Sequence, residues 1–447
     1  MISRINGMGR LILTVTSLII LFGASCSLKK EDEPGPVNPV EIPASSLEYV
    51  VFGWSEHAMH AMSATYDGAV IAVPYVTIRA QVVRRGNPPE IVTSGIRLEY
   101  NTVNNTYSYG KRSYSQFWDN SEQLFGTVLA PDTGLNFVDP GVHNGLTGSM
   151  LLKGNIFQAD GIPLTPVDDT DTWSPYQQVE IVVYEDPNSI ELARTKIVTG
   201  VSDEMNCAKC HGQGEVPSVL EAHDAAEGTT LASGGPVLCA SCHGSSALGQ
   251  NDAGSSGRYL SEAVHAFHAM NQTASAASCT DCHPGANTTL NRSTAHTATD
   301  GNCQDCHGTM GTLAATVTSG GRIPWLSEPS CISCHTFVAG VDIGTNLYSA
   351  AAGHGGLACA SCHGTGHAQI PTSETGDEYQ SVQYQNKAVT IGSCRVCHAT
   401  SKGGGLNNFM AAHGSGEKTA CYVCHTAPPP SNNPAAWPHK FQGRNRD

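Results

Sequence analysis

Apolar residues are arranged differently in the two halves of the chain. Before residue 200, short apolar and β-branched runs alternate with turn-forming segments such as RRGNPPE, APDTG and VDDTDTWSP. Runs of this kind between turn signals are typical of strands. The predicted strands cover residues 47–53, 69–83, 96–101, 178–186 and 195–201. We therefore predict an N-terminal all-β, sandwich-like domain of antiparallel strands over residues 44–200.

After residue 200 the pattern changes to short helical segments separated by glycine-rich chain. Residues 218–227 begin with a serine cap, have a glutamate three positions later and are followed by Gly228, which together mark a short helix. Residues 261–270 and 408–413 have the character of short helices as well. We expect this half to be mostly irregular, with a few short helices.

Cysteine determines the chemistry of the second half. Sixteen of the 17 cysteines form eight C-x-x-C pairs, and a histidine directly follows every pair. C-x-x-C-H is the attachment sequence of haem c, in which two thiols form thioethers to the porphyrin and the adjacent imidazole binds the iron. The attachment cysteines are Cys207, Cys210, Cys239, Cys242, Cys279, Cys282, Cys303, Cys306, Cys331, Cys334, Cys359, Cys362, Cys394, Cys397, Cys421 and Cys424. The proximal histidines are His211, His243, His283, His307, His335, His363, His398 and His425. The sequence therefore predicts eight covalently bound haems c.

Other uses of paired cysteines fit this pattern less well. A zinc ribbon does not require a histidine after every pair. A thioredoxin-like redox pair needs a βαβ setting, and a disulfide scaffold would space its cysteines irregularly. Haem attachment is the interpretation that accounts for all eight motifs.

The second half also holds histidines that can complete the coordination of each iron. Eleven histidines lie outside the motifs, and eight of them follow residue 200. Eight spare imidazoles for eight haems predict irons that mostly have two histidine ligands and are six-coordinate and low-spin. The candidate distal ligands are His223, His265, His268, His296, His354, His367, His413 and His439. Which histidine serves which haem cannot be read from the sequence.

The predicted helices suit this role. The first presents His223, and residues 261–270 place His265 and His268 three positions apart on one helical face, where they can bind two neighbouring haems. Residues 201–447 offer only about 31 residues per haem, too few to bury an apolar core of their own. The porphyrins are therefore expected to form the core of this octahaem domain.

The first residues have the features of an export signal. Two arginines precede the apolar run LILTVTSLIILF, which predicts a signal peptide over residues 1–25. Cys26 follows LFGAS and is the predicted lipidation site; the alternative is ordinary cleavage that leaves a free thiol. Residues 26–43 are charged and proline-rich, as expected of a flexible tether. With the acidic cluster Glu31–Glu33, these features predict an exported outer-membrane lipoprotein that faces the cell surface.

Charge and composition exclude some classes of protein. The net charge is −15 and no basic stripe is present, which argues against nucleic acid as a partner. The single N-terminal apolar run argues against a polytopic membrane protein. Within the β domain, the cluster His57-Ala-Met59-His60-Ala-Met62 contains donors for a soft metal such as copper. Packing in the core is the favoured interpretation of that cluster.

Several segments resemble a known family. The segments VPYVTIRAQVV (73–83), GIPLTPVDD (161–169) and VSDEMNCAKCHG (201–212) are similar to those of exported multihaem c-type cytochromes, the outer-membrane cytochromes of metal-reducing bacteria. The resemblance implies a β domain before a haem domain on an outer-membrane lipoprotein. It further implies electron transfer from periplasmic or outer-membrane donor cytochromes to an extracellular acceptor, namely a metal oxide, soluble Fe(III), a quinone or another cytochrome. Such a protein is an electron carrier or terminal metal reductase rather than a substrate-specific enzyme.

Two other functions remain open at this point. An octahaem enzyme that reduces nitrite or oxidises hydroxylamine needs one haem with an open position. The nitrite-reductase type often marks that haem with lysine in place of the motif histidine, and no C-x-x-C-K occurs here, but a hydroxylamine-type enzyme keeps C-x-x-C-H. The other alternative is self-assembly into a polymeric cytochrome wire.

Overall fold

The computed structural model describes most of the chain between Leu47 and Ala399. The described residues are 47–205, 207–270, 277–285, 287–296, 303–329 and 346–399, together with the backbone of 425–427 and 442–443. The predicted signal peptide (1–25), Cys26 and the tether (26–43) lie outside them. Within the described part, no helix is long and apolar enough to cross a membrane.

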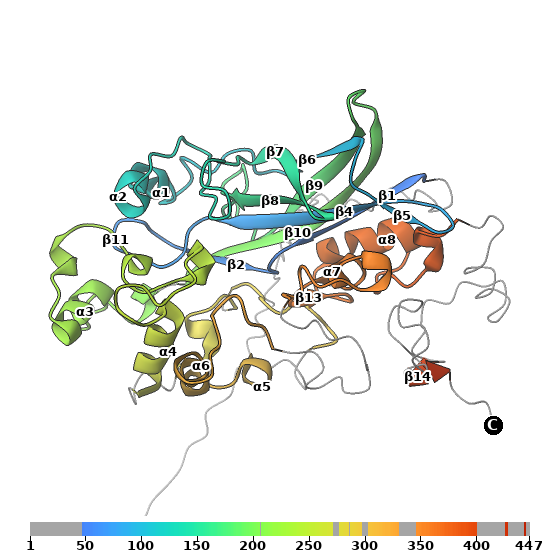
Figure 1. Ribbon diagram of the computed structural model, residues 1–447. Coiled ribbons are helices and arrows are strands. Elements are labelled where there is room, and N and C mark those ends of the chain that lie inside the picture. The colour runs from blue at the N-terminus through green and yellow to red at the C-terminus, as the bar shows by residue number, and fades with distance from the viewer. Residues whose placement is uncertain are drawn as a thin grey trace, which may run out of the picture. The chain divides into compact units, whose positions relative to one another are not determined.

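One curled sheet organises the first half of the chain (Figure 1). Its strand order is β1-β4-β8-β7-β6-β9-β10-β2, with β5 paired to β4. The strands are β1 (Tyr49–Ser55), β2 (His60–Ser63), β4 (Val76–Arg84), β5 (Glu90–Val92), β6 (Ile96–Thr102), β7 (Thr147–Lys153), β8 (Ile156–Ile162), β9 (Tyr176–Glu185) and β10 (Glu191–Met205). The sheet turns at β7, because the first half of this strand pairs with β6 and its second half pairs with β8. The prediction of a β-rich N-terminal part is confirmed, with two corrections: its main strands form one curled sheet, and β2 pairs with β10 in parallel.

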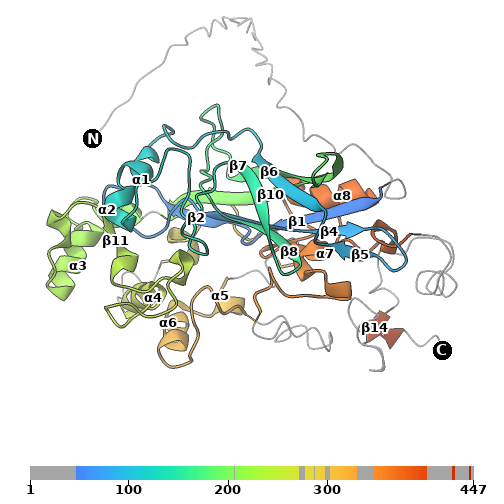
Figure 2. The same cartoon turned by 45° about the horizontal axis from the view of Figure 1, so that its top comes forward.

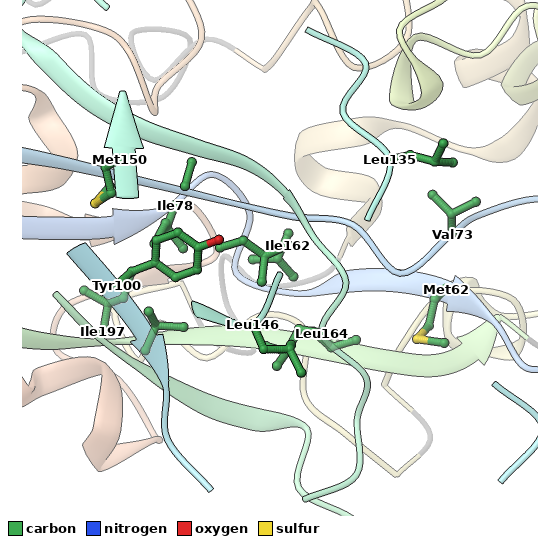
Figure 3. Close-up of a cluster of buried hydrophobic side chains, with 14 of the residues drawn as sticks. Met62, Val73, Ile78, Tyr100, Leu135, Leu146, Met150, Ile162, Leu164 and Ile197 are labelled. Carbon is green, nitrogen blue, oxygen red and sulfur yellow. The ribbon is translucent and has the colours of Figure 1, made fainter. Parts of the chain in front are cut away.

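The inside of the curl is filled by apolar side chains. Alternate residues of β9 are buried, as a strand with one face on a core requires. Figure 3 shows Ile78, Tyr100 and Ile162, which come from three strands, gathered in this core. Strand β1 comes very close to β9 and β10 at Gly53, where a Cβ would lie 2.7 Å from Ile181 Cδ1. Glycine at this position therefore allows the sheet to curl.

Strand β1 is buried on both faces, which explains its unbroken apolar run YVVFGW. Val51 faces the core inside the curl. Phe52 points the other way and packs against Tyr384, and Trp54 packs beside Ala358. The outer face of β1 is thus covered by the second half of the chain, and both views place α7 and α8 beside β1 and β4 (Figure 1 and Figure 2).

The strand predictions are confirmed at five places and incomplete at others. The structure has β1, β4, β6, β9 and β10 where strands are predicted, although the run 69–83 is split into β3 (Ala69–Val70) and β4. Strands β2, β5, β7 and β8 are missed. The turn between β7 and β8 is a two-residue loop in which Gly154 has φ +67°, a recognisable hairpin signal. Strand β10 also continues to Met205, past the expected domain boundary at residue 200.

Short helices and strand pairs make up the rest of the described structure. The α-helices are α1 (Ser115–Asp119), α2 (Ser121–Phe125), α3 (Val219–Glu227), α4 (Leu260–Met270), α5 (Cys303–His307), α6 (Met310–Thr318), α7 (Cys359–His363) and α8 (Tyr379–Gln385). The two-stranded pairs are β3 with β11 (Val237–Leu238), β12 (Gly364–Thr365) with β13 (Ala368–Gln369), and β14 (His425–Ala427) with β15 (Gln442–Gly443). The predicted helices over 218–227 and 261–270 are confirmed as α3 and α4, whereas the predicted helix over 408–413 lies outside the described residues.

The second half contains few large buried apolar side chains. The buried apolar side chains described in this half are Ala240, Leu248, Leu260, Ala314, Val317, Ala351, Ala358, Ala360, Ala368, Ile370, Tyr384 and Val396. Half of them are alanine, whereas the N-terminal half buries tryptophan, tyrosine, phenylalanine and isoleucine. Burial of side chains as small as alanine stabilises a fold only weakly. The described second half therefore gains little stability from its own apolar side chains.

Candidate haem sites

Each described C-x-x-C-H motif folds into a single helical turn that begins at its first cysteine. Four of these turns are 3-10 helices, over Cys207–Lys209, Cys239–Ser241, Cys279–Asp281 and Cys394–Val396. The other two are α5 and α7. Residues at i, i+3 and i+4 of such a turn lie on one face. The spacing of the motif therefore brings two thiols and one imidazole to the same side, as covalent attachment to one porphyrin requires.

Five motif histidines each face one of the candidate distal histidines. The distances between ring centroids are 6.4 Å for His211–His268, 6.3 Å for His243–His223, 6.0 Å for His283–His265, 5.9 Å for His307–His367 and 6.2 Å for His398–His354. An imidazole nitrogen binds a transition metal at about 2 Å, so two rings on opposite sides of one iron have centroids about 6 Å apart. The five separations fit two imidazoles on opposite sides of one iron, and each places one candidate distal histidine beside one motif histidine.

Hydrogen bonds orient several of these rings. His265 Nδ1 lies 2.6 Å from the Ser261 carbonyl oxygen, and His268 Nδ1 lies 2.8 Å from the Val264 carbonyl oxygen. His223 Nδ1 lies 3.0 Å from Thr229 Oγ1. A histidine whose Nδ1–H is donated to an acceptor presents Nε2 to a metal, and the hydrogen bond strengthens the ring as a ligand. These contacts therefore fit the ligand role of the three rings.

The same arrangement recurs in two motif histidines. His211 Nδ1 lies 3.3 Å from the Pro217 carbonyl oxygen, and His243 Nδ1 lies 2.9 Å from Ser256 Oγ. Each acceptor comes from the loop that directly follows its motif. The loops after these motifs therefore fix which nitrogen of each ring is left for the iron.

Helix α4 serves two sites at once. It presents His265 toward His283 and His268 toward His211, so one helix supplies distal candidates for the first and third motifs. The expectation that the i, i+3 pair serves two neighbouring haems agrees with this geometry. Helix α3 is held by a complete capping box at Ser218 and ends at Gly228 in the left-handed conformation, and it presents His223 to the second motif.

The first four motifs lie close to one another. Burial raises the pKa of Cys207, and the nearby Cys282 thiol adds to the shift. Burial raises the pKa of Cys239 to about 12, with a contribution from Cys207, and burial and Cys303 raise the pKa of Cys279. These interactions bring the first motif near the second and the third, and the third motif near the fourth. An ion pair between Lys209 and Asp281, inner residues of their motifs, also joins the first to the third.

Burial raises the pKa of the Cys239 and Cys362 thiols to about 12, because it disfavours the charged thiolate. Among the described residues, no three His, Cys, Asp or Glu side chains are placed to hold one metal ion. A thioether carries no charge, so burial of these sulfur atoms suits covalent attachment.

Glu204 fixes the loop after the third motif to the end of β10. Its carboxylate accepts hydrogen bonds from the backbone N–H groups of Gly285, Asn287 and Thr288, at 2.8–2.9 Å, and from Thr288 Oγ1 at 3.0 Å. The first motif begins immediately after β10. Glu204 therefore sets the position of the third motif relative to the first.

We expect Glu204→Gln to loosen this loop. The substitution replaces one carboxylate oxygen by an NH2 group, which cannot accept hydrogen bonds from the backbone N–H groups of the loop. The donors left unsatisfied cost about 1–3 kcal/mol. Amide hydrogen exchange at Gly285 and Thr288 should accelerate about tenfold or more, because about 1.4 kcal/mol corresponds to a factor of ten. Glu215→Gln, at an exposed glutamate, is the control. Equal exchange in both variants would contradict this role of Glu204.

The β domain holds the sixth and seventh motifs. Fully buried Gln81 on β4 accepts hydrogen bonds from Ala358 N, at 2.8 Å, and Ser361 Oγ, at 3.2 Å, and donates to the Gly356 carbonyl. Ala358 precedes helix α7 of the sixth motif, and Gly356 ends the turn that carries His354. One side chain of the sheet thus fixes both the sixth attachment turn and a distal candidate of the seventh.

Replacement of Gln81 by leucine should destabilise the protein by about 2–4 kcal/mol, because buried partners lose their hydrogen bonds. The free energy of unfolding in urea measures the change. Gln123→Leu is the matched control, since Gln123 is exposed and makes one bond of 3.2 Å, to the Pro236 carbonyl. Similar losses in the two variants would show that Gln81 does not anchor the two motifs.

Some predicted site residues are described only partly or not at all. His296 has Nδ1 3.4 Å from Ser293 Oγ, and His363 ends helix α7. For the eighth motif only the backbone of His425 is described, in β14. The predicted site residues outside the described part are Cys331, Cys334, His335, Cys421, Cys424, His413 and His439.

The His57–Met62 cluster is part of the protein core. Met59 and Met62 are buried, and His60 Nε2 lies 2.6 Å from the Val73 carbonyl oxygen. His57 contacts the ring of Trp325 edge to face, with centroids 4.6 Å apart. Burial lowers the pKa of both histidines to about 4. The arrangement agrees with core packing rather than a copper site.

One segment of the chain matches a known protein family. Residues 317–364 match the family model of cytochrome c554 and c-prime, and the matched stretch contains the fifth and sixth C-x-x-C-H motifs. No curated protein and no solved structure matches the chain. The match supports a c-type cytochrome, with haem c as cofactor and a haem-based role in electron transfer.

Proposed function

We propose that this protein is an exported multihaem c-type cytochrome that carries electrons through eight haems c to an external acceptor. The observation that carries the proposal is the set of five imidazole pairs with centroids 5.9–6.4 Å apart, each joining a motif histidine to a distal candidate. Two histidines per iron leave no coordination position for a substrate. Such sites suit electron transfer and not chemistry at the metal.

Bound haem supplies an Fe(III)/Fe(II) couple and a conjugated ring for electron transfer. The side chains of the protein determine where each haem would be held. Motif turns hold the thiols and one imidazole on a common face, and helices α3 and α4 present His223, His265 and His268 from the opposite side. The proximity of Cys207 to Cys239 and Cys282, and of Cys279 to Cys303, supports a path for electrons along the first four proposed haems.

The location and partners extend this proposal. The signal-like residues 1–25 and Cys26 support an outer-membrane lipoprotein, which would receive electrons from periplasmic or outer-membrane cytochromes. Metal oxides, soluble Fe(III), quinones or another cytochrome would accept them. The β domain, through Gln81, serves as the scaffold for the sixth and seventh haems.

Rapid mixing of the reduced holoprotein with different oxidants tests this function. We expect full reoxidation by a ferric chelate and no catalytic turnover of nitrite or hydroxylamine. Carbon monoxide should leave the spectrum of the reduced protein unchanged, because six-coordinate iron has no free position. Catalytic consumption of nitrite or hydroxylamine, with carbon monoxide binding to one haem, would instead establish an enzyme. Filaments in negative-stain images of the purified protein would point to a polymeric wire.

A further inference from the structure

The seventh haem site, between His398 and His354, differs from the sites of the first three motifs in how its imidazoles are held. The Nδ1 atoms of both rings are buried, and no hydrogen-bond acceptor is within reach of either one in the described part of the chain. By contrast, the rings of His211, His223, His243, His265 and His268 all have Nδ1 beside an oxygen atom. The seventh site therefore has two ligands without this support.

This difference affects the redox chemistry of the iron. A hydrogen bond from Nδ1–H makes the imidazole a stronger electron donor, which stabilises Fe(III) relative to Fe(II). Two ligands without such bonds stabilise Fe(III) less. The lack of these hydrogen bonds therefore favours a higher reduction potential at the seventh site than at the first three.

The surroundings of the seventh motif act in the same direction. Val396 and Cys397, inside the motif, pack in an apolar cluster with Phe52 and Tyr384 on the outer face of β1. An apolar environment disfavours the charged ferric site and raises the potential. The seventh haem would therefore be shielded from water by the β domain.

Positive charge is also concentrated beside this motif. The guanidinium of Arg85 donates to the carbonyl oxygens of Arg395 and Val396, at 2.8 and 3.1 Å, and to that of Leu47 at 2.9 Å. None of the ion pairs among the described residues includes Arg85. Cations near an iron favour its reduced form.

From these three observations we infer that the haem between His354 and His398 has a higher reduction potential than the haems of the first three motifs. Electrons shared among these four haems therefore collect at it first. The inference rests on the proposed function, because it requires both histidines to bind iron. Arg85 acts here as a positioning and tuning residue of the β domain.

A potentiometric titration followed by EPR tests the inference. His354→Ala should remove one low-spin ferric signal and create one high-spin signal, which identifies the seventh haem. In the wild-type holoprotein, the signal so identified should disappear before that of the second haem as the potential is lowered. His223→Ala identifies the second haem in the same way and serves as the comparison. The inference is overturned if the seventh haem is reduced together with the second or after it.

The same variants separate this inference from the proposed function. If His354→Ala leaves every low-spin signal in place, His354 is not a ligand and the assignment of the pair itself fails. A second variant, Arg85→Gln, keeps both ligands and provides the test where His354→Ala does not assemble. It should move one haem's transition to lower potential, whereas Arg85→Lys, which keeps the charge, should shift that transition less. An Arg85→Gln protein in which no transition moves would overturn the inference.

Discussion

Replacement of Ala266 by proline is expected to convert two haems from low-spin to high-spin in a single step. Ala266 lies inside α4, between His265 and His268, whose rings face two different motif histidines. Proline inside a helix removes a backbone hydrogen bond and clashes with the preceding turn, at a cost of about 3 kcal/mol. Both imidazoles should then leave their irons. EPR of the ferric holoprotein, with haem counted by the pyridine haemochrome method, measures the change.

Three variants serve as controls for this result. Ala266→Ser keeps the helix and should leave all haems low-spin. His265→Ala and His268→Ala should each produce one high-spin haem, so that their sum equals the effect of the proline. A proline variant that retains every low-spin haem, in a protein with its full haem content, would show that α4 does not supply the two ligands.

Replacement of Arg292 by methionine should lower the free energy of unfolding by about 3–5 kcal/mol. Arg292 is 1% exposed and binds Asp377 through two hydrogen bonds, of 2.7 and 2.9 Å. It also donates to the Ala58 carbonyl oxygen at 2.8 Å. The backbone N–H of Arg292 donates to the His367 carbonyl oxygen at 2.7 Å. Arg292 therefore links the loop of the distal candidate His367 to the β domain. Methionine would leave a buried carboxylate without its partner, and urea unfolding measures the loss.

An exposed ion pair supplies the control for this prediction. Arg194 pairs with Glu191 at the surface, and Arg194→Met should cost less than about 1 kcal/mol. The double variant Arg292→Met/Asp377→Leu should recover part of the lost stability, because no unpaired charge remains. Equal effects of Arg292→Met and Arg194→Met would contradict the structural role of the buried pair.

Local signals explain the parts of the fold that the sequence predicts correctly. Helix α3 is defined by a serine cap and a terminal glycine that lie within one short segment. The C-x-x-C-H spacing fixes one helical turn without help from distant residues, and the i, i+3 spacing of His265 and His268 places them on one face. Each of these features depends on neighbours in the sequence alone.

The pairing of ligands depends on contacts between distant segments, which is why it could not be predicted. His307 faces His367 and His354 faces His398, and nothing in either segment of a pair identifies its partner. Gln81 is another example. A glutamine in a strand is ordinarily read as exposed to solvent, yet the second half of the chain covers the outer face of β1 and β4 and buries it completely.

The spin state of the ferric holoprotein tests the central claim most directly. Eight haems per chain, all low-spin by EPR at cryogenic temperature, are the expected result, because the proposal assigns two histidines to every iron and five such pairs lie at a fitting distance. A high-spin ferric signal that integrates to one haem per chain would contradict the account. That haem would have an open coordination position, and the protein would then be an enzyme and not an electron carrier.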